Sequence, residues 1–461
     1  MNIIKQVLIT TLIVIMLHSN ALANSGPTYW DGNPASEMMV IDENSPIQVE
    51  NEQLVFDFTN SERFSYTVNG QVTATYEMMN PTDEPQQVQM VFPFINKLNH
   101  FNPDTTTITV ENESIAYELF LGTSILSNEK KSYFEFGKIV EQITNKSYEA
   151  QHFHEEEKGK LYKINVTPTI DEEINVAIPL NFDANKTKVL STGFNGFERR
   201  NQHTTITAWC YQPRTLEIFV LGEDIDFQIN AYSDGERNVK SDAIRYEVST
   251  SEVGLKDYLL NSIKNNENIQ YDDFISEIQL YNLYANALDE TLTKFEGYSS
   301  EYDLYEQGDY DRIMSFVYTV QFPPKSKQKV AVTYNALGTM DKTKTITPLF
   351  SFDYLLNPAK NWRDFKNLSV KIIAPQEAPF IIDSSIALEE TDNHVYTAYL
   401  EQLPAEDLSF TFYSKEKITQ LDKFEGNFRE PFLFNAFMGF SLFFILVCVF
   451  HFYKVRKRKQ V

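Results

Sequence analysis

The chain has 461 residues, of which 42% are hydrophobic and 14% aromatic, a composition that excludes a disordered or low-complexity protein. Residues 24–430 contain all 64 acidic residues but only 34 of the 40 basic ones, a net charge of −30. This charge excludes nucleic acid or anionic lipid as the main partner of that region, because both would be repelled. It leaves open whether the charge serves cationic ligands, loosely bound divalent ions or solubility alone.

The N-terminus has the three parts of an export signal. Lys5 supplies a positive charge, Val7–Leu17 is an apolar run, and the small residues Ala21 and Ala23 fit a signal-peptidase site. The apolar run is too short to span a bilayer as a helix. We therefore expect residues 1–23 to be a cleaved signal peptide; the alternative is an uncleaved anchor.

Turn-rich residues 24–46 are interpreted as an extended arm that leads into a first β-rich module over residues 47–248. Val72–Met78 alternates with period two, as a half-buried strand does, and Val88–Phe92 is read as its partner strand. Asn80–Pro85 lies between them and is rich in turn-forming residues, so a hairpin is expected here. Asn69-Gly70 indicates a second tight hairpin just before.

A similar order of features occurs twice, about 150 residues apart. Tyr162–Pro168 is followed by a polar turn and the strand Val176–Ile178; Tyr318–Pro324 is followed by a polar turn and Val330–Val332. The pattern predicts a mainly β fold with two β-sandwich-like modules in tandem, residues 47–248 and 301–418. The alternative is that unrelated hairpins look alike.

Between these modules, residues 249–300 are predicted to be a helical insert. Apolar residues recur at three- and four-residue steps from Phe274 to Phe295, and Gly297 can end that helix in the left-handed conformation. A shorter helix is expected over Ser251–Lys264, and a small one over Phe134–Ile143.

The C-terminus is predicted to be a membrane anchor. Residues 419–430 form a stalk, residues 431–453 a transmembrane helix without charged residues, and residues 454–461 a basic tail. By the positive-inside rule the tail stays in the cytoplasm, which makes the protein a single-pass, type I protein of the cell membrane with its ectodomain outside. The residues that carry this prediction are Phe440, Phe443, Phe444, Lys454, Arg456, Lys457, Arg458 and Lys459.

The two cysteines offer no disulfide within the ectodomain, because Cys448 lies in the predicted span and Cys210 stands alone. The absence of disulfides in so large an exported domain favours a Gram-positive bacterial surface. Cys210 lies in an alternating strand between two aromatic residues, which is typical of a buried structural thiol rather than a nucleophile.

Few patterns carry chemistry. No Gly-x-Ser-x-Gly elbow and no Gly-rich phosphate loop occurs. His152 and His154 are spaced to share one face of a strand and so are candidate ligands for a divalent cation, although the acidic and basic residues after them also fit the lead into a hairpin. Apart from this possible cation, no cofactor is expected.

Two segments resemble known proteins. Thr73–Phe94, with its Asn-Pro-x-x-Glu turn and Phe-Pro ending, and Gly159–Ile178 resemble vault-protein/inter-alpha-inhibitor (VIT-like) β-domains. Asp383-Ser384-Ser385 departs from the von Willebrand A metal motif, so metal-dependent adhesion is not implied. Tyr354–Val370 resembles segments of uncharacterised exported, membrane-anchored bacterial proteins, which implies topology and β architecture.

The function expected from these features is that of a non-enzymatic surface or envelope protein that interacts with a protein or a wall component. The alternatives are a membrane-anchored extracytoplasmic hydrolase and a cation-binding ectodomain. A hydrolase acting on glycans would need converging carboxylates in a cleft lined by aromatic residues.

Overall fold

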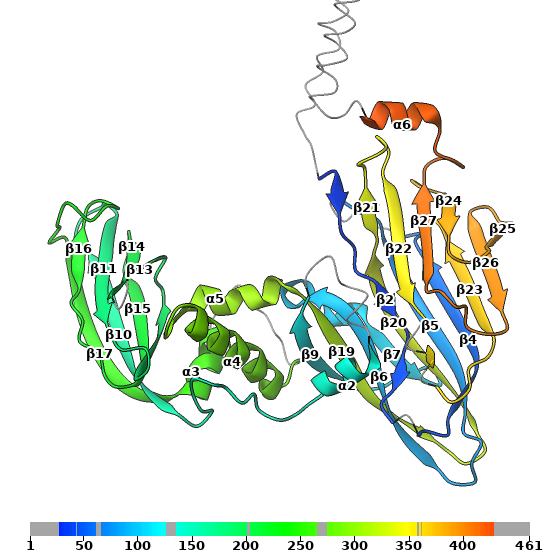
Figure 1. Cartoon of the computed structure of the whole chain (residues 1–461), viewed down its shortest axis with the longest axis horizontal. Helices are drawn as coiled ribbons and strands as arrows, with labels where there is room; N and C mark the ends of the chain where they lie inside the picture. Colours follow the sequence, from blue (N-terminus) through cyan, green and yellow to red (C-terminus); the bar gives the residue numbers. More distant parts are fainter. Residues whose placement is uncertain are drawn as a thin grey trace, which may run out of the picture.

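The computed structural model describes residues 27–42, 44–60, 66–125, 135–200, 203–264, 274–356, 359–360 and 362–427. They form a large β lobe and a small β lobe with helices between them (Figure 1). The expected mainly β fold is confirmed.

The large lobe contains three sheets. Their strand orders are β25-β26-β23-β4-β5-β20-β7-β8, β1-β21-β22-β27-β24 with β2 also on β22, and β3-β6-β19-β9. The strands are β1 (Tyr29–Trp30), β2 (Ala35–Ser36), β3 (Met39–Val40), β4 (Gln48–Asp57), β5 (Asn69–Met79), β6 (Gln86–Lys97), β7 (Thr107–Val110), β8 (Glu113–Ser114), β9 (Glu118–Ser124), β19 (Asp311–Phe322), β20 (Lys327–Leu337), β21 (Thr339–Asp341), β22 (Leu349–Leu355), β23 (Leu368–Ile373), β24 (Phe380–Ser384), β25 (Glu389–Asp392), β26 (Val395–Leu400) and β27 (Leu408–Tyr413).

The small lobe is a two-sheet sandwich. In the sequence it is inserted between the two parts of the chain that form the large lobe. Its sheets have the orders β17-β10-β15-β12-β18 and β13-β14-β11-β16. The strands are β10 (Lys158–Pro168), β11 (Ile174–Asn181), β12 (Thr187–Thr192), β13 (Gly196–Arg200), β14 (His203–Cys210), β15 (Arg214–Gly222), β16 (Asn230–Tyr232), β17 (Ile244–Gly254) and β18 (Tyr298–Ser300). Cys210 is buried in the core of this sandwich, as its alternating surroundings predict.

The expected tandem arrangement is wrong. β5 pairs along its whole length with β20, and β6 pairs with β19, so residues before and after the small lobe lie in the same sheets. β4 also runs parallel to β23. Residues 47–248 and 301–418 are therefore not two successive modules. Alternation along the chain locates a strand, but its partner is chosen by burial in three dimensions.

The hairpin expected between Val72–Met78 and Val88–Phe92 is not formed, and of the second only the pairing is present: β4 and β5 pair antiparallel, but Asn69-Gly70 is not the turn between them. Val72–Met78 and Val88–Phe92 are strands, but β5 and β6 belong to different sheets. The turn between them carries the chain from one sheet to the other, and the buried side chain of Asn80 fixes it by donating to the carbonyls of Phe322 (3.2 Å) and Pro323 (3.0 Å). Asn69-Gly70 begins β5 rather than forming a turn.

Aromatic side chains fill the interior between the eight-stranded sheet and the sheet of β22 and β27. Phe58 lies against Phe352 (4.5 Å between ring centroids) and Phe412 (5.0 Å), and Phe410 lies against Phe56 (5.1 Å). Most of these pairs are edge-to-face, the arrangement that the ring quadrupoles favour. These rings join strands that are more than 290 residues apart in the sequence.

The helices α3, α4 and α5 lie between the lobes (Figure 1). The helices of the structure are α2 (Phe136–Gln142), α3 (Leu255–Lys264), α4 (Glu277–Lys294), α5 (Glu301–Tyr305) and α6 (Gln420–Asn427), with short 3-10 helices η1 (Leu98–His100), η2 (Pro103–Thr105) and η4 (Glu306–Asp309). The predictions of α2 and α4 are confirmed. The helix predicted from Ser251 begins only at Leu255, because Ser251 still belongs to strand β17, where it pairs with Leu161 of β10.

Gly297 ends α4 in the left-handed conformation, as the sequence predicts. Its φ is +88°, and its N–H donates to the carbonyl of Leu292 (2.7 Å). A Cβ at this position would lie 3.1 Å from Cβ of Ala184. Because glycine alone adopts this conformation without strain, the residue fixes how the chain turns from α4 into β18.

We expect Gly297→Ala to lower the free energy of unfolding by about 1–2 kcal/mol, from left-handed strain and close packing. Gly137→Ala is the matched control: Gly137 lies in α2, and its Cβ would meet nothing within 4 Å. The control should be neutral or stabilising by about 0.5–1 kcal/mol, since alanine is the better helix former. Denaturant unfolding of both variants checks the prediction, and equal effects would contradict it.

The predicted signal peptide and the span at 431–453 lie outside the described residues, as do Phe440, Phe443, Phe444 and the basic tail. Among the described residues, none of the helices has the length and hydropathy to cross a membrane. The predicted stalk at 419–430 begins with α6.

Candidate functional site

The two histidines of the predicted metal site do not lie on a strand. Residues 151–157 form bends and turns ahead of β10, so the shared face that the prediction needs is absent. The Nδ1 atom of His152 is 2.6 Å from Oδ1 of Asp289 on α4, while the backbone N–H of His154 donates to Glu157 (3.2 Å). Within the described ranges, no group of three or more His, Cys, Asp or Glu side chains is placed to hold a metal.

His152 instead belongs to a linker that α4 holds by hydrogen bonds. Gln279 donates to the carbonyl of Thr144 (2.9 Å), Asn282 to that of Lys146 (2.8 Å), and Asp289 accepts from the N–H groups of Gln151 (2.9 Å) and His152 (3.1 Å). These α4 side chains recur at helical spacing and so form one polar stripe. The stripe binds the segment that runs from the large lobe to the small lobe.

A groove opens where the small lobe meets the helices, and its volume is about 1070 Å³. One wall is the outer face of the sheet that contains β10, β12, β15 and β17; the other is formed by α3 and α5. α3 continues β17 without a loop, and β18 pairs in parallel with β12 before it leads into α5, so the sheet itself positions both helices. The lining residues are Leu161, Lys163, Thr192, Arg214, Thr215, Glu217, Ser251, Val253, Tyr258, Asn261, Ser262, Glu301, Tyr302 and Tyr305.

Glu301 is the most constrained charged group in the groove. One carboxylate oxygen accepts from the N–H of Gly193 (2.8 Å), and the other accepts from the hydroxyl of Tyr305 (3.3 Å). Burial raises the pKa of Glu301 above its usual range, although these hydrogen bonds and Arg214 act in the opposite direction. Its first-turn position on α5 and the Ser300/Asp303 capping box fix its backbone.

The other carboxylate of the groove is already paired. Glu217 lies 2.8 Å from the Nζ atom of Lys163, its direct cross-strand neighbour. Arg214, which also lines the groove, makes no ion pair among the described residues, and its guanidinium donates to the carbonyl of Trp209 (3.4 Å).

Tyrosines supply the aromatic surface. Tyr258 stacks on Phe219 with ring centroids 4.4 Å apart, and its hydroxyl is hydrogen-bonded to Thr192 (3.0 Å). Tyr302 is 49% exposed and so presents a ring to solvent at the mouth of the groove. Rings of this kind, beside hydroxyl and amide groups such as those of Thr215 and Asn261, can bind a polar ligand that has an apolar face.

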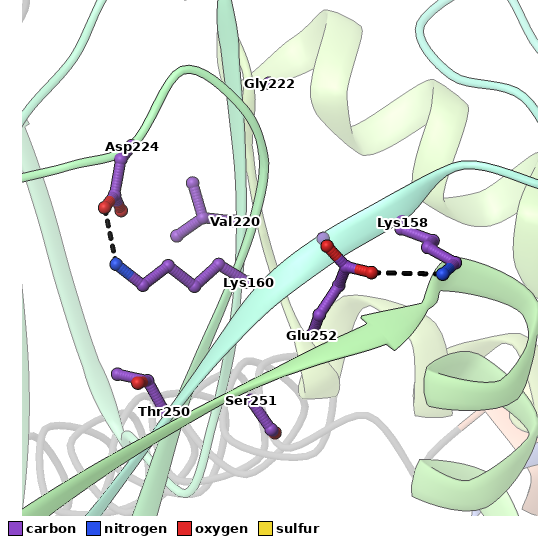
Figure 2. Close-up of a pocket in the computed structure, with 9 residues that line it drawn as sticks. Lys158, Lys160, Val220, Gly222, Asp224, Thr250, Ser251 and Glu252 are labelled. Carbon is purple, nitrogen blue, oxygen red and sulfur yellow. Dashed lines mark hydrogen bonds and ion pairs between the residues drawn. The ribbon is translucent and has the colours of Figure 1, made fainter.

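A second, smaller pocket of about 440 Å³ is lined mainly by residues of β10, β15 and β17 and shares Ser251 with the groove. Figure 2 shows that its two lysines point toward carboxylates: Lys160 lies 2.6 Å from Asp224, and Lys158 lies 3.0 Å from Glu252. This pocket has less than half the volume of the groove, and no aromatic side chain of the described residues lines it, so it offers less surface to a ligand.

Sequence reasoning did not single out the groove residues. A signal for them is present in the segment from Tyr298 to Tyr310, where tyrosines alternate with acidic residues directly after the long predicted helix. The contribution of Glu217, by contrast, depends on the packing of β15 under α5, which no local pattern shows.

Comparisons with known proteins do not place the chain in a family. No protein-family model matches it, and no curated protein is similar to it. Among solved structures, this chain is similar to that of "a putative nutrient binding protein" from Legionella pneumophila, with 9% sequence identity and a TM-score of 0.35. The match covers 84% of this chain and 73% of the Legionella chain.

Proposed function

We propose that this protein is a non-enzymatic surface or envelope protein whose groove between the small lobe and the helices binds a neutral, hydroxyl-rich ligand such as a wall glycan. The observation that carries the proposal is the combination in one groove of an exposed tyrosine ring, hydroxyl and amide groups, and the ion pair Lys163–Glu217. Saccharides offer alternating apolar faces and hydroxyl edges, which match such a lining.

The proposal includes the membrane anchor predicted from residues 431–453. The net charge of −30 between the two hydrophobic ends would keep polyanions away from the lobes, whereas a neutral glycan is not repelled. The chemistry of the groove and the charge of the surface thus favour the same class of partner.

Binding of soluble cell-wall glycan fragments, measured by calorimetry, tests this proposal. We expect Tyr302→Ala to weaken binding roughly tenfold, because about 1.5 kcal/mol of ring contact is lost. Tyr211→Ala is the matched control, since Tyr211 is 64% exposed and lies in the turn between β14 and β15, away from the groove. Loss of binding in both variants, or in neither, would count against the groove.

A second candidate function is hydrolysis of a glycan. It is favoured by Glu301, a carboxyl of raised pKa that shares an aromatic-lined groove with Glu217. Such a pair has the residue types of a general acid and its partner carboxylate. Release of new reducing ends by the wild-type protein, abolished in Glu301→Gln, would establish this activity; binding without any release would remove it.

A further inference from the structure

The large lobe contains a pair of carboxyl groups with no exposure to solvent. Glu37 lies between β2 and β3, and Glu52 lies on β4; both side chains are 0% exposed. They are surrounded by the apolar residues of the main core. Two carboxyl groups in such a place cannot both ionise without a large loss of stability.

Every titratable group that acts on the pair is an acid or a phenol. Tyr76 on β5 donates to Oε2 of Glu37 (2.5 Å), and Tyr354 on β22 and Tyr334 on β20 lie close enough to be affected by its charge. No lysine, arginine or histidine of the described residues is among the groups that shift the pKa of either carboxyl. Among the described residues, the elements around the pair place no compensating cation beside it.

The hydrogen bonds of the pair are incomplete. Among the described residues, no donor lies in good hydrogen-bonding geometry to Oε1 of Glu37 or to either side-chain oxygen of Glu52, although the hydroxyls of Tyr354 and Tyr76 lie near enough to lower the pKa of Glu37 and of Glu52, respectively. All three atoms are buried, and buried polar atoms normally have a partner because an unmet hydrogen bond costs about 1–3 kcal/mol. A proton between the two carboxyl groups would supply the missing donor.

Glu37 belongs to a segment that passes through the core. The five consecutive residues Ser36–Val40 are at most 1% exposed. This segment is held by pairing of β2 with β22 and of β3 with β6, and by the indole of Trp362, which donates to the carbonyl of Met38 (3.1 Å). We call residues 27–42 the N-terminal arm.

We propose that Glu52 is protonated and donates a hydrogen bond to Glu37, and that this shared proton holds the N-terminal arm in the large lobe. Glu37 belongs to the N-terminal arm, whereas Glu52 belongs to a strand of the eight-stranded sheet. The shared proton therefore joins the arm to that sheet. Removal of the proton leaves two buried negative charges side by side, which favours withdrawal of the arm.

The pH dependence follows from burial, which raises the pKa of Glu37 to about 7 and that of Glu52 well above its usual range. The folded state therefore holds protons that the unfolded state releases above its ordinary carboxyl pKa of 4.5. The contribution of the pair to stability is complete below that pH and falls as the pH rises through neutrality and beyond. Carboxylates of lowered pKa, such as Asp289 and Asp422, act in the opposite direction, so the contribution of the pair must be isolated by substitution.

The test compares the thermal midpoints of the wild type, Glu37→Gln and Glu52→Gln from about pH 5 to about pH 9. A glutamine amide provides a permanent donor of the same shape. The midpoint of each variant relative to the wild type should therefore rise by about 5 °C across this range. Glu77→Gln is the matched control, because Glu77 follows Tyr76 on β5 but is exposed on the other face; its difference from the wild type should not change with pH.

Two further measurements use the protein even where a glutamine variant is unstable. In a Trp209→Phe background, the remaining tryptophans are Trp30 of the arm and Trp362, which contacts it. Their emission should shift to the red at alkaline pH as the arm withdraws. Infrared spectra of the wild type should show a protonated-carboxyl band at neutral pH that is weaker in Glu52→Gln.

The proposal would be overturned if the thermal midpoints of the wild type and of both variants changed with pH in parallel, or if the wild type showed no protonated-carboxyl band. Restoration of alkaline stability by Na⁺ or Ca²⁺ in the wild type but not in Glu52→Gln would overturn it too, since the pair would then hold a cation rather than a proton.

Discussion

Asp289→Ala is expected to lower the free energy of unfolding by about 3 kcal/mol, one of the largest effects of any single substitution in the chain. The carboxylate is 4% exposed and accepts from Tyr148 (3.1 Å), from the N–H groups of Gln151 and His152, and from the ring of His152 (2.6 Å). Alanine would leave these donors in a partly buried place with no acceptor.

The effect should depend on pH. The hydrogen bonds from Gln151, His152 and Tyr148 hold the pKa of Asp289 below its ordinary value of 3.8, although burial alone would raise it. The contribution of a carboxylate of lowered pKa is present above the ordinary value and is lost as the pH falls through the folded one. The gap between wild type and Asp289→Ala should therefore narrow on acidification.

Denaturant unfolding of Asp289→Ala and of Glu290→Ala measures this contribution. Glu290 is the next residue on α4 and is exposed, so its replacement should change stability by less than about 0.5 kcal/mol. Because Asp289 binds the linker between the lobes, hydrogen exchange in residues 148–152 should also accelerate in its variant. An unchanged exchange rate would show that the stripe on α4 does not hold the linker.

Phe410→Ala is expected to destabilise the large lobe by about 3–5 kcal/mol, the usual cost of removing a buried phenylalanine ring. Phe410 on β27 is 2% exposed and contacts Phe56 on β4 and Phe352 on β22, so its ring bridges two sheets. The cavity would lie between two packed sheets, where little backbone movement can close it.

Phe197→Ala is the control for this loss. That ring is 39% exposed in the small lobe, so its removal should cost less than half as much. Thermal unfolding followed by the near-ultraviolet signal would show the difference. Equal losses in the two variants would mean that the aromatic cluster of the large lobe contributes no more than a surface ring.

Local pattern was sufficient for the elements themselves. The alternation of Val72–Met78 and the three- and four-residue steps from Phe274 to Phe295 correctly predicted a strand and a helix, and Gly297 correctly predicted the end of that helix. These properties depend on residues within one or two turns of each other, so the sequence carries them directly. The burial of Cys210 followed in the same way from its alternating neighbours.

The partners of each element were not predictable in this way. β5 has the alternation of a hairpin strand, yet it lies between β4 and β20, and the strand that follows it joins another sheet. The choice is made by the aromatic core, where Phe56, Phe352 and Phe410 meet across more than 290 residues. Such contacts depend on summed burial rather than on neighbours in sequence.

The candidate sites show the same division. Composition and charge alone established a large acidic chain, and the alternating pattern predicted that it is rich in β structure. Only the tertiary structure brings Glu301 to the outer face of β15, because that contact depends on how α5 packs against the small lobe. In the same way, Glu37 lies beside Glu52 only because the N-terminal arm passes between the sheets of the large lobe. The physical reason is that burial and hydrogen bonding set the chemistry of a carboxyl group, and both are properties of the packed structure.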